Sequence, residues 1–89
     1  MTFATGATLT HATARVVFEA GLAQIAAGAT QVDCAALTQF DSAALAVLLG
    51  WRRAAVEHGT ALEVLNLPAQ LASLAVAYGI DALLTPVSH

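Results

Sequence analysis

The chain has 89 residues, a length that predicts one small domain with a single modest core. Three arginines, no lysine and six acidic residues give a net charge of −3. No basic stripe is therefore present that could neutralise the phosphates of a nucleic acid or hold anionic lipid head groups, and we expect the chain to bind no nucleic acid.

Neither membrane insertion nor export is predicted. The longest uncharged run, residues 64–80, is interrupted by four residues that do not suit a membrane-spanning helix: Asn66, Pro68, Gln70 and Gly79. The N-terminus has no basic segment ahead of an apolar run, as a signal peptide would have. We expect a cytoplasmic protein without direct membrane insertion, forming one domain over residues 1–89 with a flexible tail at residues 85–89.

The N-terminal third predicts a strand followed by a helix. Residues 3–9 are rich in threonine and interrupted by Gly6, which is typical of a weak strand at an edge or with a bulge. Residues 12–27 predict a helix, with Thr10 as N-cap and Gly28 just beyond its end. Its apolar positions recur at helical spacing: Ala14, Phe18, Leu22 and Ile25.

The middle of the chain predicts a short buried strand at residues 31–35. Val32 and Cys34 would face one way and Asp33 the other, because side chains alternate along a strand. Cys34 is the only cysteine, so it cannot form an internal disulfide, and we interpret it as a small buried apolar residue.

A second helix is predicted from Asp41 or Ser42 to Gly59. Either residue can cap its start, and Gly59 follows His58 at its end. Large and apolar residues extend through it: Leu45, Leu48, Leu49, Trp51, Arg52 and Val56. Trp51 is predicted either to lie in the core or to contact a partner, and an aromatic residue in such a stripe is more often part of the core.

The last third predicts a strand at residues 61–65 and a third helix. Pro68 suits the first helical position, and Gly79 followed by Ile80 resembles a Schellman ending. Four residues form the expected apolar stripe: Leu71, Leu74, Ala75 and Tyr78. The predicted order is β-α-β-α-β-α, which indicates an α/β domain with a small, mostly parallel or mixed sheet covered by about three helices. Helices on one face would leave the other to be covered by a partner, a second copy or polar side chains.

The reactive side chains in the sequence do not match the motif of a known type of active site. Ser42 lacks the G-x-S-x-G context of a hydrolase nucleophile, although His11 and an acid could be imagined beside it. Neither metal-ligand spacing nor a phosphate-binding glycine loop is present. We expect a non-enzymatic protein without catalytic residues, metal or cofactor.

The segment Gln39-Phe40-Asp41-Ser42 is the strongest candidate for partner binding. An Asp-Ser pair at a helix start can serve only to cap the free N–H groups there. A hydroxyl at the same place also lies where backbone donors and the helix dipole favour a phosphate. Ser42 is thus a candidate phosphoacceptor or contact for a partner, and local chemistry leaves both interpretations open.

Three stretches resemble a known family. Residues 32–49, V-D-C-A-A-L-T-Q-F-D-S-A-A-L-A-V-L-L, resemble the signature of STAS domains, in which a V-D-x-S-x-L strand exit leads to D-S-A-G-L at a helix start. Residues 59–71 and 74–84, with Tyr78-Gly79-Ile80, look like the MlaB branch of that family. The resemblance extends over residues 9–84.

The resemblance implies an accessory subunit of an ABC-type transporter that maintains outer-membrane lipid asymmetry by moving phospholipid between the two membranes of a diderm bacterium. Such a subunit binds and supports an MlaF-like ATPase subunit and associates peripherally with the inner membrane through the complex. By the same resemblance, Ser42 occupies the position that contacts the ATPase, and Asp41 the acid before it. In the branch of anti-sigma-factor antagonists, the corresponding serine is phosphorylated by a kinase.

Two departures from the family pattern bear on these expectations. Ala44 replaces the usual glycine after D-S-A, and we expect its methyl group beside the hydroxyl to hinder a kinase. Residues 1–9 supply one strand where STAS domains usually begin with two, so we expect an exposed sheet edge. The alternatives to the transporter subunit are a phosphorylation-controlled antagonist and a domain that carries lipid between its own layers.

Overall fold

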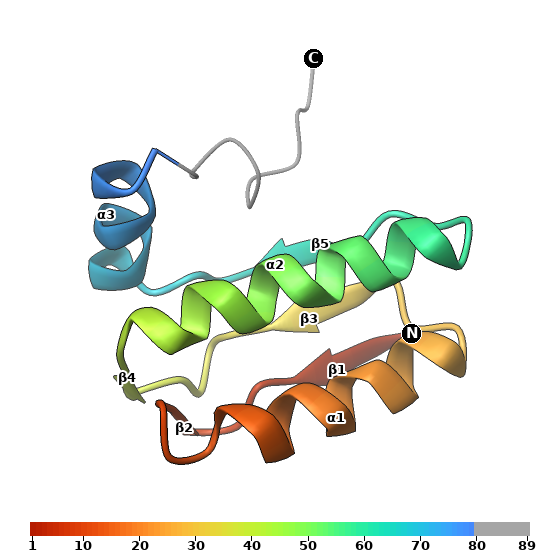
Figure 1. The fold of residues 1–89 in the computed structure, drawn as a ribbon, viewed down its shortest axis with the longest axis horizontal. Helices are drawn as coiled ribbons and strands as arrows, with labels where there is room; N and C mark the ends of the chain where they lie inside the picture. Colours follow the sequence, from red (N-terminus) through yellow and green to blue (C-terminus); the bar gives the residue numbers. More distant parts are fainter. Residues whose placement is uncertain (80–89) are drawn as a thin grey trace.

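Three parallel strands form the main sheet of the computed structural model, which describes residues 1–79 (Figure 1). They are β1 (Thr2–Ala4), β3 (Gln31–Asp33) and β5 (Glu63–Leu65), in the spatial order β1-β3-β5. Val32 pairs with Phe3 on one side and with Val64 on the other. These three apolar side chains therefore share one face of the sheet.

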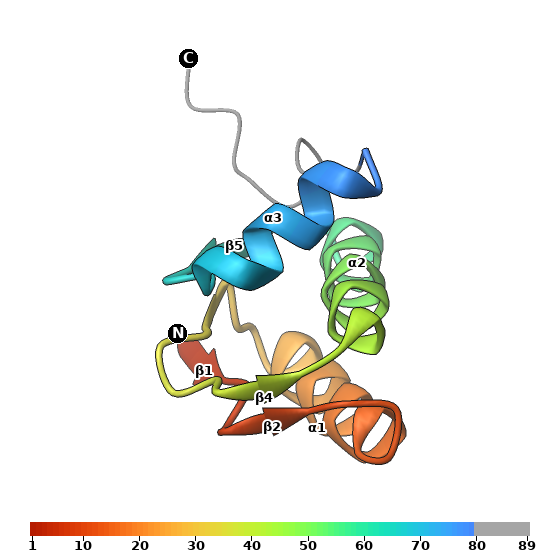
Figure 2. The same cartoon turned by 90° about the vertical axis from the view of Figure 1, so that its left-hand side faces the viewer.

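Helices α1 (Ala14–Ala26) and α2 (Ser42–Glu57) lie on that same face of the sheet (Figure 2). Helix α3 (Ala69–Ala77) lies at the end of the molecule toward which the strands point (Figure 1). The parallel strands with two intervening helices follow the right-handed crossover pattern expected for such units. The predicted α/β class with parallel strands and three helices is confirmed.

The N-terminal strand differs from the prediction. Residues 3–9 do not form one strand but two, β1 and β2 (Thr8–Leu9), separated at Gly6, whose φ is +78°. β2 pairs in parallel with β4 (Gln39–Phe40), a strand that the sequence analysis did not predict. Two-residue strands carry no recognisable alternation, and only pairing of distant segments defines them.

Two predicted helix starts are also displaced. Thr10 does not cap α1; Thr13 precedes the helix, and its N–H donates to the carbonyl of Thr10 at 3.0 Å in a turn. Pro68 is the residue before α3 rather than its first residue. Tyr78 is 60% exposed and so does not belong to the buried stripe of α3. The predicted tail, residues 85–89, and the contribution of Ile80 to a Schellman ending lie outside the described residues.

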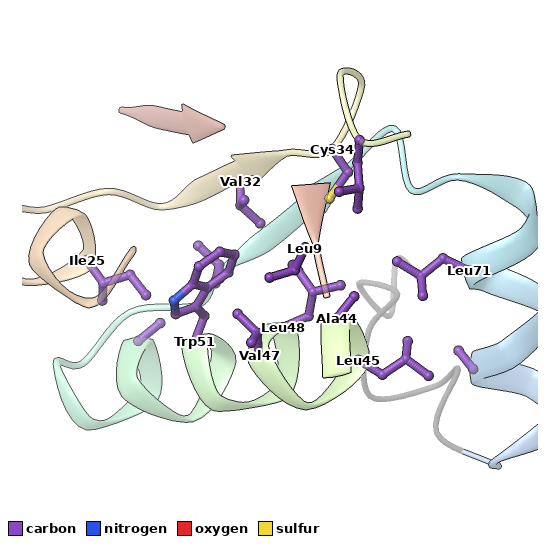
Figure 3. Packing of buried hydrophobic residues seen from close by; sticks show 14 residues of the cluster. Leu9, Ile25, Val32, Cys34, Ala44, Leu45, Val47, Leu48, Trp51 and Leu71 are labelled. Carbon is purple, nitrogen blue, oxygen red and sulfur yellow. The ribbon is translucent and has the colours of Figure 1, made fainter. Parts of the chain in front are cut away.

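Trp51 is the largest buried side chain and belongs to the core (Figure 3). Its indole N–H donates to the backbone carbonyl of Phe18 at 2.9 Å, which satisfies the ring's only polar group. The ring of Phe3 meets the indole edge-on, with the centroids 5.1 Å apart. Trp51 thus joins α2 to both β1 and α1, and the open choice between core and partner contact is decided in favour of the core.

Around Trp51, apolar side chains from all three helices and from the strands are packed between the sheet and the helices (Figure 3). Cys34 is fully buried among them, as predicted. The fully buried large residues besides Trp51 are Leu9, Leu48, Leu71 and Val32.

Polar side chains cover the sheet face opposite α1 and α2. The Thr2 hydroxyl donates to Gln31 Oε1 at 2.7 Å, and the Gln31 amide donates to Glu63 Oε1 at 2.7 Å. These residues occupy equivalent positions on β1, β3 and β5, so the bonds cross the whole sheet. This face of the sheet is therefore covered by polar side chains, which can lie in contact with water.

Candidate functional site

The segment from Gln39 to Ser42 lies at the end of the sheet where the strands terminate, and it leads from β4 into α2 (Figure 1). Its backbone is held by β2 and by the loop before it, since the N–H groups of Thr38 and Gln39 both donate to the carbonyl of Ala7, at 2.9 and 3.0 Å. Pairing of β2 with β4 therefore fixes where α2 begins.

Asp41 is the N-cap of α2. Its Oδ1 accepts the N–H of Ala43 at 2.8 Å, which satisfies one of the free donors in the first turn. Its Oδ2 accepts the backbone N–H of His11 at 3.0 Å and lies 2.9 Å from His11 Nδ1. The backbone hydrogen bond from His11 is the largest cause that lowers the pKa of Asp41, and the ring and Ala43 N–H add to it.

Ser42 is the first residue of α2 and is exposed. Its hydroxyl takes no part in the hydrogen bonds that fix the helix start, which are accepted by the carboxylate and the backbone carbonyl of Asp41. A polar group at an exposed helix start, on a backbone held by hydrogen bonds, is accessible to a partner.

The two preceding residues differ from each other in exposure. Gln39 is exposed, and its side-chain Oε1 accepts the hydroxyl of Thr8 at 3.2 Å on the neighbouring strand β2. Phe40 is half-buried and packs against the hydrophobic core. Of the four candidate residues, Ser42 and Gln39 thus present polar groups outward, whereas Phe40 and Asp41 also hold the segment in place.

Ala44 does not lie beside the Ser42 hydroxyl at the surface, contrary to the expectation from the sequence. It is fully buried, and its methyl group belongs to the core. The physical reason is the helical rotation of about 100° per residue, which turns a side chain two positions further on toward the sheet. The methyl group therefore cannot hinder the approach of a partner to Ser42.

His11 is the contributor to this site that sequence reasoning missed. The sequence suggests it only as a hydrolase base for Ser42, yet it binds Asp41 from a turn 30 residues earlier in the chain. No local pattern signals such a pairing, since only the pairing of β2 with β4 brings the two turns together.

Among the other candidate reactive groups, Cys34 is buried in the core. Burial raises the pKa of the Cys34 thiol to about 11, with Asp33 as a second cause, so the thiol is neutral and inert at physiological pH. Within residues 1–79, no three side chains of the types His, Cys, Asp and Glu lie close enough to hold a metal ion. In the same part of the chain, no helix combines the length and the apolar character that crossing a membrane requires.

Comparison with known proteins gives one match. The family model described as "Mlab, STAS domain" matches residues 5–85, which is nearly the whole chain. No curated protein and no solved structure matches significantly. The match includes every helix and strand of the structure except β1, and it includes the helix start at Asp41 and Ser42. The chain belongs to the MlaB-type STAS-domain family.

Proposed function

We propose that this protein is a non-enzymatic accessory subunit that binds and supports the ATPase of an ABC-type transporter. The transporter moves phospholipid between the inner and outer membranes and so maintains the lipid asymmetry of the outer membrane. The subunit is cytoplasmic and associates with the inner membrane peripherally, through the ATPase. Membership of the MlaB-type family supports this assignment.

The observation that carries the proposal is the exposed hydroxyl of Ser42 at a helix start that Asp41 caps. Both carboxylate oxygens of Asp41 accept hydrogen bonds that hold this helix start. The neighbouring Ser42 is therefore already in place before a partner binds, and no loop has to become ordered. A preformed contact residue lowers the entropic cost of association. Gln39, exposed two residues before the cap, lies on the same segment and extends the proposed contact.

The direct test is the affinity of the purified protein for the ATPase subunit of the same organism's intermembrane phospholipid transporter. Ser42→Glu adds charge and bulk where the partner packs, and it should weaken binding about tenfold or more, as expected for a central interface residue. Thr30→Glu is the matched control, because it adds the same charge at an exposed residue directly before β3, at the opposite end of the sheet.

Calorimetry should show weakened binding for Ser42→Glu and wild-type affinity for Thr30→Glu, with unchanged circular dichroism for both. Equal affinity of Ser42→Glu and the wild type would remove Ser42 from the interface. Absence of any complex with the ATPase, together with normal outer-membrane asymmetry after gene deletion, would refute the function itself.

A second candidate function is an anti-sigma-factor antagonist controlled by phosphorylation of Ser42. The burial of Ala44 favours it, since the methyl group leaves the hydroxyl accessible to a kinase. Incubation with an anti-sigma kinase of the same organism should then add one phosphate, seen in the intact mass, and Ser42→Ala should abolish the addition. An unchanged mass of the wild-type protein would reject this alternative.

A further inference from the structure

We draw no further inference here: the strongest candidate, the hollow on α2 lined by Leu49, Arg52, Arg53 and Val56, carries nothing, because the Arg52 Nη1 atom that has no hydrogen-bond partner among residues 1–79 is itself buried and out of reach of a ligand, and nothing in the structure shows what covers the hollow.

Discussion

His11 and Asp41 join two turns that lie 30 residues apart in the chain. The backbone N–H of His11 donates to Asp41 Oδ2 at 3.0 Å, and His11 Nδ1 lies 2.9 Å from the same oxygen. Because the other oxygen of Asp41 caps α2, one side chain fixes both the β2–α1 turn and the helix that begins with Ser42. The position of the proposed contact residue therefore depends on this pair.

Removal of the carboxylate should destabilise the helix start. Asp41→Ala leaves the N–H groups of Ala43 and His11 without their protein acceptor, and we expect a lower midpoint of thermal unfolding. Asp41→Asn retains one amide oxygen and should lose less. An Asp41→Ala variant as stable as the wild type would show that water replaces these bonds at no cost.

The pH dependence of stability should follow from the same carboxylate. The pKa of Asp41 in the folded protein lies below its ordinary value of 3.8, mainly because of the His11 backbone hydrogen bond. A depressed folded pKa contributes stability that is fully present above 3.8 and is lost as the pH falls through the folded pKa. Urea unfolding across the acid range should show this loss in the wild-type protein.

In Asp41→Asn, the decline of stability with falling pH should be shallower. Asp33 is a second carboxyl group whose pKa is lowered in the folded protein, because it accepts hydrogen bonds from the Asn66 side chain and from the Ala35 N–H. Asp33→Asn should therefore flatten the decline independently. If neither substitution changes how steeply the stability falls at low pH, the assignment of these hydrogen bonds would be contradicted.

Gly21 should tolerate no side chain while Trp51 is present. A Cβ on Gly21 would overlap the indole atoms Cε2, Nε1 and Cζ2, so Gly21→Ala should cost about 1–3 kcal/mol through overpacking. In a Trp51→Leu background the side chain ends at its δ carbons and these atoms are absent, so Gly21→Ala should be nearly neutral or stabilising, because alanine favours a helix more than glycine does. If a double-mutant cycle shows the same cost in both backgrounds, the indole of Trp51 is not the group that excludes a Cβ at Gly21.

Leu48 should distinguish a buried from an exposed face of α2. It is fully buried, so Leu48→Asp places an unpaired carboxylate in the core and should cost about 4 kcal/mol or more, enough to unfold a small domain. Leu48→Met conserves volume and should cost less than about 1.5 kcal/mol. A folded, soluble Leu48→Asp variant would mean that this face of α2 is not packed on the sheet.

The Cys34 thiol should not react with thiol reagents while the protein is folded. Its side chain is fully buried and its pKa is raised to about 11, so little thiolate forms at pH 8 and a thiol reagent cannot reach the sulfur. A disulfide-exchange reagent should react with the native protein only at the rate of unfolding, and promptly in urea. Rapid reaction of the native thiol at pH 8 would show that the strand around Cys34 opens on its own.

The helices and the central strands could be predicted from the sequence because their signals are local. The spacing of Ala14, Phe18, Leu22 and Ile25 and the alternation around Val32 each report one element and the face that it buries. The candidate segment was also found locally, from an Asp-Ser pair at a helix start and from its resemblance to STAS domains.

The tertiary structure decided what depends on distant pairing. The split of residues 3–9 and the strand at Gln39–Phe40 exist because β2 and β4 bind each other, and neither carries a pattern of its own. Burial of Ala44 and Trp51 depends on which side of α2 faces the sheet.

The sequence by itself thus determined the class of fold, the family and the helix start that carries Asp41 and Ser42, because periodicity, caps and motifs are properties of short segments. Only the tertiary structure decided that His11 holds Asp41 and that the bare face of the sheet is polar. These two features arise from contacts between elements that are far apart in the chain.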